Sequence, residues 1–191
     1  MLNINCDLGE GLNNEHIIMP LIDSCNIACG GHAGDSGSMI ECVEISIKNN
    51  VKIGAHPSYP DKINFGRKKI DISPSELSYS IISQIESLET IADSYGLELN
   101  HIKAHGALYN QMIIDTELSN FYLDTIKDFK NKCSLYIPYK SEIEKIASLG
   151  VLEAFDNENI ISNTMIQEKI MKNALNAMMD NYDFIVIIVS F

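Results

Sequence analysis

Short β-rich runs alternate with longer helical patterns along this chain, and this alternation constrains its fold more than any other feature. Strands are expected at residues 2–6, 25–29, 51–55, 101–104, 134–137, 151–155 and 184–189. Helices are expected at residues 13–22 (interrupted by Pro20), 38–48, 74–95, 118–130, 141–148 and 168–179. Such alternation is typical of a parallel sheet covered by helices, so the sequence predicts one α/β domain over residues 1–191. Seven strands without a glycine-rich nucleotide fingerprint favour a closed or nearly closed barrel over a doubly wound sheet, although periodicity alone does not separate the two.

The clearest helix start lies at Ser73. Its side chain can accept from the backbone as N-cap, Pro74 suits the first helical position, and Glu76 completes a capping box. This helix is expected to run to Tyr95 and to stop at Gly96, because glycine commonly ends a helix.

Charge and cysteine content exclude several classes of protein. The chain has 14 Lys+Arg against 26 Asp+Glu, a formal charge of −12, which argues against a nucleic-acid partner. Arg67 is the one arginine, so a site built from an arginine cluster is ruled out. Five cysteines, an odd number, and the lack of a secretory leader predict reduced thiols and a cytoplasmic location. The longest apolar run, at 184–189, is too short to span a membrane.

Polar residues gather after the first four predicted strands. They are Asp7, Gly9 and Glu10; Gly30, Gly31, His32, Gly34 and Asp35; His56, Pro57, Ser58, Tyr59 and Asp61; and Lys103, His105, Gly106, Tyr109 and Asn110. All four groups fall at the carboxyl ends of strands, where parallel α/β folds and barrels build their active sites.

Side-chain alternation refines this prediction. Alternate residues of a strand share a face, so Asn5 and Asp7 point one way, and Lys103 and His105 likewise share a face. Since the helix-covered outer face takes the apolar residues, these four side chains are expected to point into the barrel mouth. Buried charge is costly there unless it is paired or functional.

A single histidine after a strand is usually a hydrogen-bonding loop residue, but several that converge with a carboxylate favour a site. The histidines in this setting are His32, His56 and His105. His16 lies in a weak helix and His101 opens a strand, so both are expected to be structural.

Two further loop features have alternative explanations. Gly30, Gly31 and Gly34 can cradle a phosphate with backbone N–H groups, or they can simply form a tight turn. Asp61 and Arg67 can pair across the long loop after the third strand, where an exposed pair contributes only about 0–1 kcal/mol.

The residue types indicate hydrolysis or another addition to a carbonyl group. A carboxylate or imidazole activates water while a cation stabilises the developing oxyanion. Histidine and aspartate at a barrel mouth could equally hold a divalent metal that activates water.

Four motifs resemble those of the LamB/YcsF family, which is identified with the A subunit of bacterial 5-oxoprolinase. They are NCDLGEG at 5–11, NIACGGHAGD at 26–35, GAHPSYPD at 54–61 with FGR at 65–67, and KAHGALYN at 103–110. The resemblance implies a distorted seven-stranded (β/α) barrel of the glycoside hydrolase/deacetylase type, here with an incomplete C-terminal part. It also implies opening of 5-oxo-L-proline to L-glutamate with ATP and Mg, performed together with B and C subunits.

On this resemblance we expect Asp7 to be the general base, Lys103 to steady the oxyanion or phosphate, and His105 to protonate the ring nitrogen. His32 and His56 are the expected ligands of a possible divalent metal. The residues expected to bind or orient substrate are Asn5, Glu10, Asn26, Gly30, Asp35, Ser58, Arg67, Tyr109 and Asn110.

The later motifs of the family, an Ala-Asp-Arg-x-Tyr type after the sixth strand and a Val-His-Gly-Asp closing the last, have no counterpart at 153–159 or 188–191. Two alternatives therefore stay open: a catalytically silent homologue that keeps a ligand or partner site, and a metal-dependent amide or carbohydrate deacetylase. An apolar strand at an open barrel edge needs cover, so we also expect a homo-oligomer.

Overall fold

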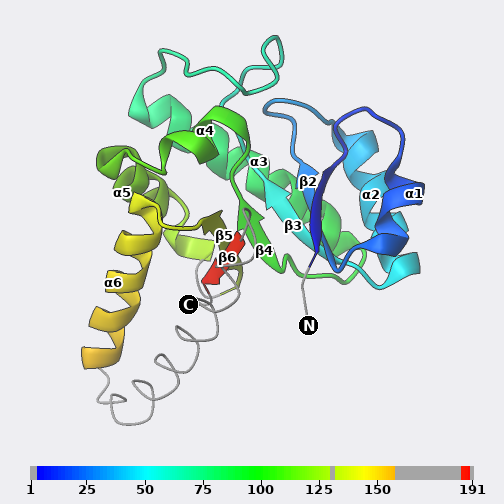
Figure 1. Ribbon diagram of the computed structural model, residues 1–191. Coiled ribbons are helices and arrows are strands. Elements are labelled where there is room, and N and C mark those ends of the chain that lie inside the picture. Colours follow the sequence, from blue (N-terminus) through cyan, green and yellow to red (C-terminus); the bar gives the residue numbers. More distant parts are fainter. Residues whose placement is uncertain (1–3, 130–131, 158–185, 190–191) are drawn as a thin grey trace.

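The structure is a computed structural model that describes residues 4–129, 132–157 and 186–189, and its core is a curved six-stranded sheet (Figure 1). The strands follow one another in chain order: β1 (Asn5–Leu8), β2 (Ser24–Ala28), β3 (Lys52–His56), β4 (His101–Lys103), β5 (Ser134–Pro138) and β6 (Val186–Val189). β1 to β5 pair in parallel and curl into a half-barrel, which confirms the predicted α/β fold for this part of the chain.

The last strand departs from the predicted parallel arrangement. β6 pairs antiparallel with β5, with Leu135 opposite Val189 and Pro138 opposite Val186. Strand–helix alternation predicts parallel neighbours only where one helix returns the chain to the same edge of the sheet. The direction of this final strand was therefore predicted wrongly, although a strand in this region was expected.

Helices connect the strands. They are α1 (Glu15–Ile18), the 3₁₀ segment η1 (Met19–Leu21), α2 (Ser36–Asn49), α3 (Pro74–Ser94), α4 (Gly106–Gln111), α5 (Thr116–Thr125), the 3₁₀ segment η2 (Lys127–Phe129) and α6 (Glu142–Asn157). The capping box before α3 is confirmed, because the Ser73 side chain accepts from the backbone N–H of Glu76 and the Glu76 carboxylate accepts in return from that of Ser73.

The helices depart from the sequence prediction at α4 and at α6. The strand expected at 151–155 is wrong, because α6 continues through this stretch to Asn157. Leucine, glutamate and alanine are strong helix formers, and a lone glycine such as Gly150 costs a helix only about 1 kcal/mol. The short helix α4 was not expected, and the helix predicted at 168–179 lies outside the described residues.

The two faces of the sheet differ sharply in chemistry. The outer face carries apolar side chains such as Ile27, Ile53, Ile102 and Leu135, which are buried in one core together with helices α2, α3 and α6. The opposite, inner face carries polar residues, defined here as Asn5, Asp7, Ser24, Asn26, His56, His101, Lys103 and Tyr136, with Gly54 between them. Because alternate strand residues point to opposite faces, this polar surface follows directly from the sequence pattern.

All five cysteines are free thiols, as the sequence predicts. Among the described residues, no helix is both long and apolar enough to cross a membrane.

Candidate active site

An ion pair on the inner face joins the first and fourth strands. Lys103 Nζ lies 2.8 Å from Asp7 Oδ1, and their side chains are 14% and 34% exposed, so the pair is partly open to solvent. Asn26 on β2 donates from Nδ2 to Asp7 Oδ1 at 2.7 Å and to Asn5 Oδ1 at 2.8 Å. The predicted convergence of these side chains is therefore present in the structure.

His101 lies behind this group and supports it. Its Nε2 is 2.6 Å from Asn26 Oδ1, and its ring stacks on Tyr136 with 4.0 Å between ring centroids. Because the Asn26 amide donates on its other side, His101 donates through Nε2 and so fixes which way the amide points. The sequence assigned His101 a purely structural role, although its alternation with Lys103 places it on the same face.

Glycine at position 54 makes room for this contact. Gly54 is the register neighbour of Asn26 on one side and of His101 on the other, so the imidazole crosses over Gly54 to reach Asn26. A Cβ at this position would lie 2.2 Å from His101 Nε2.

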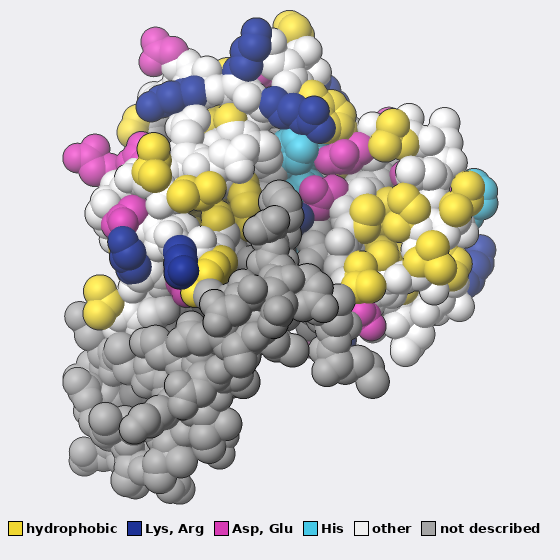
Figure 2. All heavy atoms as spheres, in the orientation of Figure 1, with side chains coloured by type: hydrophobic (Ala, Val, Ile, Leu, Met, Phe, Trp, Pro, Cys, Tyr) yellow, Lys and Arg dark blue, Asp and Glu magenta, His cyan; other side chains and the backbone are white. Residues whose placement is uncertain are grey.

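Next to the ion pair, one glutamate and three histidines form a second cluster at the carboxyl ends of the strands. The Glu10 carboxylate lies 3.0 Å from His32 Nε2 and 3.5 Å from His105 Nδ1, and His105 Nδ1 lies 3.0 Å from His56 Nε2. His32 also stacks on His105 with 3.6 Å between ring centroids. His56 Nε2 is 3.4 Å from Asp7 Oδ2, so the cluster touches the ion pair. Figure 2 shows histidine and acidic side chains meeting on this face of the molecule.

Backbone carbonyl groups fix two of the imidazoles. His56 donates from Nδ1 to the carbonyl of Lys103 at 2.7 Å, and His105 donates from Nε2 to the carbonyl of Phe65 at 3.0 Å. Each of these two rings therefore turns its other nitrogen into the cluster.

The loop that carries Phe65 is held in an uncommon conformation. Phe65 has a φ of 55° and Gly66 one of 61°, both in the left-handed region, and a non-glycine residue there is strained. Gly66 packs so closely that a Cβ would lie 2.9 Å from His32 Cβ, and its carbonyl accepts from Ala107 N. The strained turn thus serves to place a carbonyl group behind His105.

A buried glutamine that the sequence analysis did not single out ties two of the site loops together. Gln84 on α3 accepts from Ser58 N and donates to Ser58 O, each at 2.9 Å. It also lies against Gly31, where a Cβ would be 2.2 Å from Gln84 Oε1. Gln84 therefore fixes the segments that carry His32 and His56. A polar residue inside the apolar stripe of a helix was the available sequence signal.

The site keeps its two acids charged and lowers the pKa of two of its imidazoles, His32 and His105. Burial alone raises the pKa of Asp7, but hydrogen bonds and charge from His56 and Lys103 outweigh it and hold that pKa well below its usual range. Burial also raises the pKa of Glu10, but the hydrogen bond from His32 and the charges of the neighbouring histidines outweigh this effect, so the pKa of Glu10 is lowered. Burial and then the neighbouring histidines lower the pKa of His105 to about 4.

Other predicted site residues have contacts of their own within the fold. Asp35 caps α2 by accepting from Ser38 N, and Gly30 has a φ of 92° in a tight turn. The Ser58 hydroxyl donates to the carbonyl of Tyr59. The possible pairing of Asp61 with Arg67 across the loop is not seen among the described residues: Asp61 accepts from Asn64, and the Arg67 guanidinium lies 5.1 Å from the centre of the Phe65 ring.

Two predicted residues lie on α4 close to the ion pair. Tyr109 is half-buried, with Lys103 Nζ 6.0 Å from the centre of its ring, and burial followed by the charge of Asp7 raises its pKa to about 12. Asn110 is exposed at the surface of the same helix.

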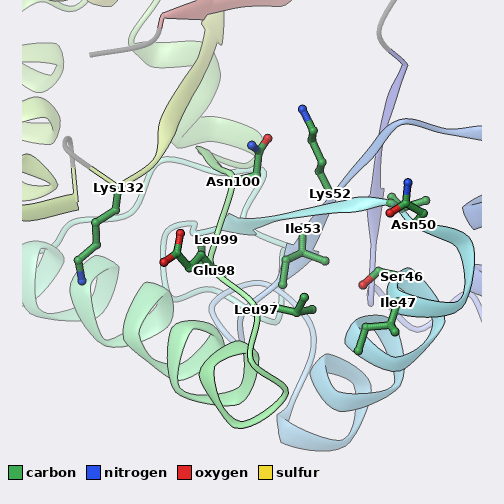
Figure 3. Close-up of a pocket in the computed structure, with 11 residues that line it drawn as sticks. Ser46, Ile47, Asn50, Lys52, Ile53, Leu97, Glu98, Leu99, Asn100 and Lys132 are labelled. Carbon is green, nitrogen blue, oxygen red and sulfur yellow. The ribbon is translucent and has the colours of Figure 1, made fainter.

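A pocket of about 460 Å³ lies at the other end of the sheet (Figure 3). Residues before and at the start of β3 and β4 line it, together with Lys132. Parallel α/β folds place catalytic groups at the carboxyl ends of strands, so this pocket is not our candidate for catalysis.

The arrangement at the carboxyl ends suits two kinds of chemistry. A lysine beside a carboxylate can stabilise an oxyanion while neighbouring groups move a proton. The ligand atoms of Glu10, His32, His56 and His105 lie within 4.8 Å of one another, so this cluster could also hold a metal ion. The predicted metal residues His32 and His56 are both in it.

Comparison with known proteins agrees with the motifs. The sequence model of the LamB/YcsF family matches residues 2–175. The crystal structure of the lactam utilization protein from Thermus thermophilus is similar, with 33% sequence identity and a TM-score of 0.72. The match covers 75% of this chain and 60% of the Thermus chain, so this protein corresponds to a little over half the length of that relative.

Proposed function

The chain belongs to the LamB/YcsF family, and from this membership and the geometry above we propose that it opens the ring of a lactam by hydrolysis. The proposed substrate is 5-oxo-L-proline and the product L-glutamate. The observation that carries the proposal is the Asp7–Lys103 pair, partly open to solvent and in contact with the histidine cluster. The name of the Thermus relative, a lactam utilization protein, supports the substrate class.

In this proposal Lys103 faces the oxygen of the scissile amide. Its ammonium group stabilises the negative charge that develops there as water adds to the carbonyl carbon. While Asp7 is bonded to Lys103 and Asn26 it is a weak proton acceptor, because its pKa is far below the usual range. If Lys103 turns toward the substrate oxygen, Asp7 loses a cationic partner and becomes a better base for the attacking water.

The ring nitrogen must gain a proton as the C–N bond breaks. His105 Nδ1 faces the cluster and is the proposed donor, with the carbonyl of Phe65 holding the other ring nitrogen. An imidazole supplies that proton only after it has received one. Asp7 takes the proton of the attacking water and passes it to His105 through His56 Nε2, which lies 3.4 Å from Asp7 Oδ2 and 3.0 Å from His105 Nδ1.

The wider assignment follows the family. We propose ATP with Mg as the co-substrate. Transfer of the γ-phosphoryl group to the amide oxygen releases ADP and makes the carbonyl carbon a better electrophile, and the group leaves as inorganic phosphate after water has added. We also propose B and C subunits as partners, a homo-oligomeric state and a cytoplasmic location. The half-barrel is proposed to be part of a distorted seven-stranded (β/α) barrel of the deacetylase type.

The test is glutamate release from 5-oxoproline and ATP in the presence of B and C subunits from the same source. Lys103→Met should abolish turnover while the circular dichroism spectrum stays unchanged. Lys68→Met, which removes an exposed lysine, serves as the matched control and should keep activity. Near-normal turnover in Lys103→Met would refute the role given to the ion pair.

The Glu/His cluster favours a second candidate, a metal-dependent amide or carbohydrate deacetylase. A bound metal would supply Lewis-acid polarisation of a carbonyl group. Release of acetate from N-acetylated amino acids or sugars without ATP, abolished by a chelator, would favour this candidate over lactam opening. Binding of 5-oxoproline without any turnover would instead indicate the silent homologue.

A further inference from the structure

Two imidazole nitrogens in the cluster face each other without a hydrogen atom to share. His56 Nε2 and His105 Nδ1 lie 3.0 Å apart. Each ring already uses its N–H on a backbone carbonyl, His56 on that of Lys103 and His105 on that of Phe65. In the neutral rings the two facing nitrogens are therefore both lone-pair acceptors, and they repel each other unless a cation lies between them.

Additional acceptors point into the same space. The Glu10 carboxylate oxygen is 3.5 Å from His105 Nδ1, and Asp7 Oδ2 is 3.4 Å from His56 Nε2. A proton bridges only two atoms, whereas a metal ion accepts three or more donors at once. The number of converging lone pairs therefore favours a metal ion over a shared proton.

We propose that Glu10, His56 and His105 bind one divalent transition-metal ion of the zinc class, as the metal-dependent candidate function requires. With the metal bound, the lone pair of His105 Nδ1 is used on the ion, so His105 is then a ligand and not the proton donor of the lactam reaction. The donor spacing fits this assignment. Ligand atoms about 2.0–2.2 Å from a tetrahedral zinc lie about 3.4 Å from one another, close to the 3.0 and 3.5 Å observed. The set of two imidazoles and one carboxylate leaves a coordination position open for water or substrate.

His32 has a different role from the other two histidines. Its Nε2 lies 3.0 Å from Glu10 Oε1, its ring is stacked on His105, and its Nδ1 is buried with no hydrogen-bond partner among the described residues. A donor held against a ligating carboxylate orients that carboxylate and sets its basicity. We therefore assign His32 as a positioning residue for Glu10, not as a third histidine ligand.

The supporting contacts are those that metal sites normally have. Histidine ligands usually donate their second ring N–H to a carbonyl or carboxylate, which fixes the tautomer and the ring orientation. His56 and His105 both do so, and Gln84 clamps the backbone next to His56 through Ser58. These contacts hold the two rings in the orientation that a shared metal ion requires.

The chemistry of the donors also selects the ion. Imidazole suits zinc, cobalt, nickel and iron, whereas magnesium and calcium prefer sites made entirely of oxygen atoms. The buried thiols do not compete, because burial raises the pKa of Cys29 and of Cys42 to about 12 and keeps both protonated.

Metal binding can be tested without substrate, so its failure is separate from failure of the lactam reaction. The full chain, freed of metal with a chelator and dialysed, is titrated with Zn²⁺ and with Mg²⁺ by calorimetry, and bound metal is counted by mass spectrometry. Co²⁺ is then added as a visible-absorption probe of the coordination geometry. We expect one equivalent of Zn²⁺ that excess Mg²⁺ does not displace, and a Co²⁺ spectrum of low coordination number.

Variants distinguish ligands from the positioning residue. His56→Gln, His105→Gln and the nearly isosteric Glu10→Gln should each lose stoichiometric zinc binding. His32→Gln should keep one equivalent with an affinity about 10- to 100-fold weaker. His16→Gln, on the exposed surface of α1, is the matched control and should bind like the unaltered chain. Circular dichroism checks that each variant is folded.

Several outcomes would overturn the proposal. One is the absence of zinc binding in the folded, unaltered chain. Another is unchanged zinc binding in both single variants, Glu10→Gln and His105→Gln, when each is folded. Complete loss of binding in His32→Gln would make His32 a ligand and refute its positioning role.

Discussion

Replacing Gly54 by alanine tests whether the inner face is built around the contact between His101 and Asn26. The added Cβ would lie 2.2–2.4 Å from three atoms of the His101 ring. Ordinary carbon contacts are about 3.5 Å or longer, so the ring must move by about 1 Å. Stacking on Tyr136 limits this movement, and such a shift would break the 2.6 Å bond to Asn26.

The loss of stability expected in Gly54→Ala has two parts. Overpacking a buried site costs about 1–3 kcal/mol, and leaving buried polar groups without their hydrogen bond costs about 1–3 kcal/mol more. We therefore expect Gly54→Ala to lower the free energy of unfolding by about 4 kcal/mol. In a domain of this size that corresponds to a fall in Tm of about 8–16 °C.

The assay is urea unfolding followed by circular dichroism, with a double-mutant cycle. In the double variant Gly54→Ala/His101→Ala the clash is absent. Its loss in free energy of unfolding should therefore be about 2–3 kcal/mol smaller than the sum of the losses in the two single variants. Gly96→Ala is the control, because nothing lies within 4 Å of its added Cβ and only its positive φ is strained, at about 1–2 kcal/mol. Additive effects in the cycle, or a Gly54→Ala chain as stable as the original, would refute this reasoning.

Three further predictions rest on buried or capping contacts. Burial lowers the pKa of His101 to about 3, so the unfolded chain binds a proton that the folded chain does not, and stability should fall by about 2 kcal/mol between pH 7 and pH 5. Urea midpoints at the two pH values should show this loss of stability, and in His101→Gln the loss should be smaller by about 2 kcal/mol. Equal pH dependence in the two chains would contradict the lowered pKa of His101. Gln84→Met should cost about 2–4 kcal/mol in thermal unfolding, because the buried N–H and C=O of Ser58 lose their partners, and an unchanged Tm would count against the clamp. Ser73→Ala should cost about 1 kcal/mol, measured the same way, with Ser83→Ala, an exposed serine of the same helix, as control; equal effects would show that the cap is not specific.

Local patterns were enough for much of the fold. The five parallel strands lie within a few residues of their predicted ranges, because each is a short β-rich run between helical patterns. The start of α3 was predicted to the residue, since its capping box uses only neighbours in the chain. The error at 151–155 arose where apolar residues suited a helix and a strand equally well, a choice that local pattern does not make.

The candidate site was predicted in outline and not in its contacts. Alternation placed Asn5, Asp7 and Lys103 on one face, and the structure joins them. It did not identify Gln84, whose partner Ser58 is 26 residues away, nor the carbonyl of Phe65 behind His105. These contacts depend on how loops fold back over the ends of the strands.

Strand alternation and strand–helix order are local properties of the chain, and they were enough to predict which residues face inward and which end of the strands carries the chemistry. Local patterns did not predict that β6 runs antiparallel, that His101 reaches Asn26 across Gly54, or that His56 and His105 face each other through nitrogens that carry no proton in the neutral rings. Each of these depends on lateral register between strands or on a backbone carbonyl from a distant loop. Distances of that kind are set by packing of the whole sheet against its helices, and no local pattern encodes them.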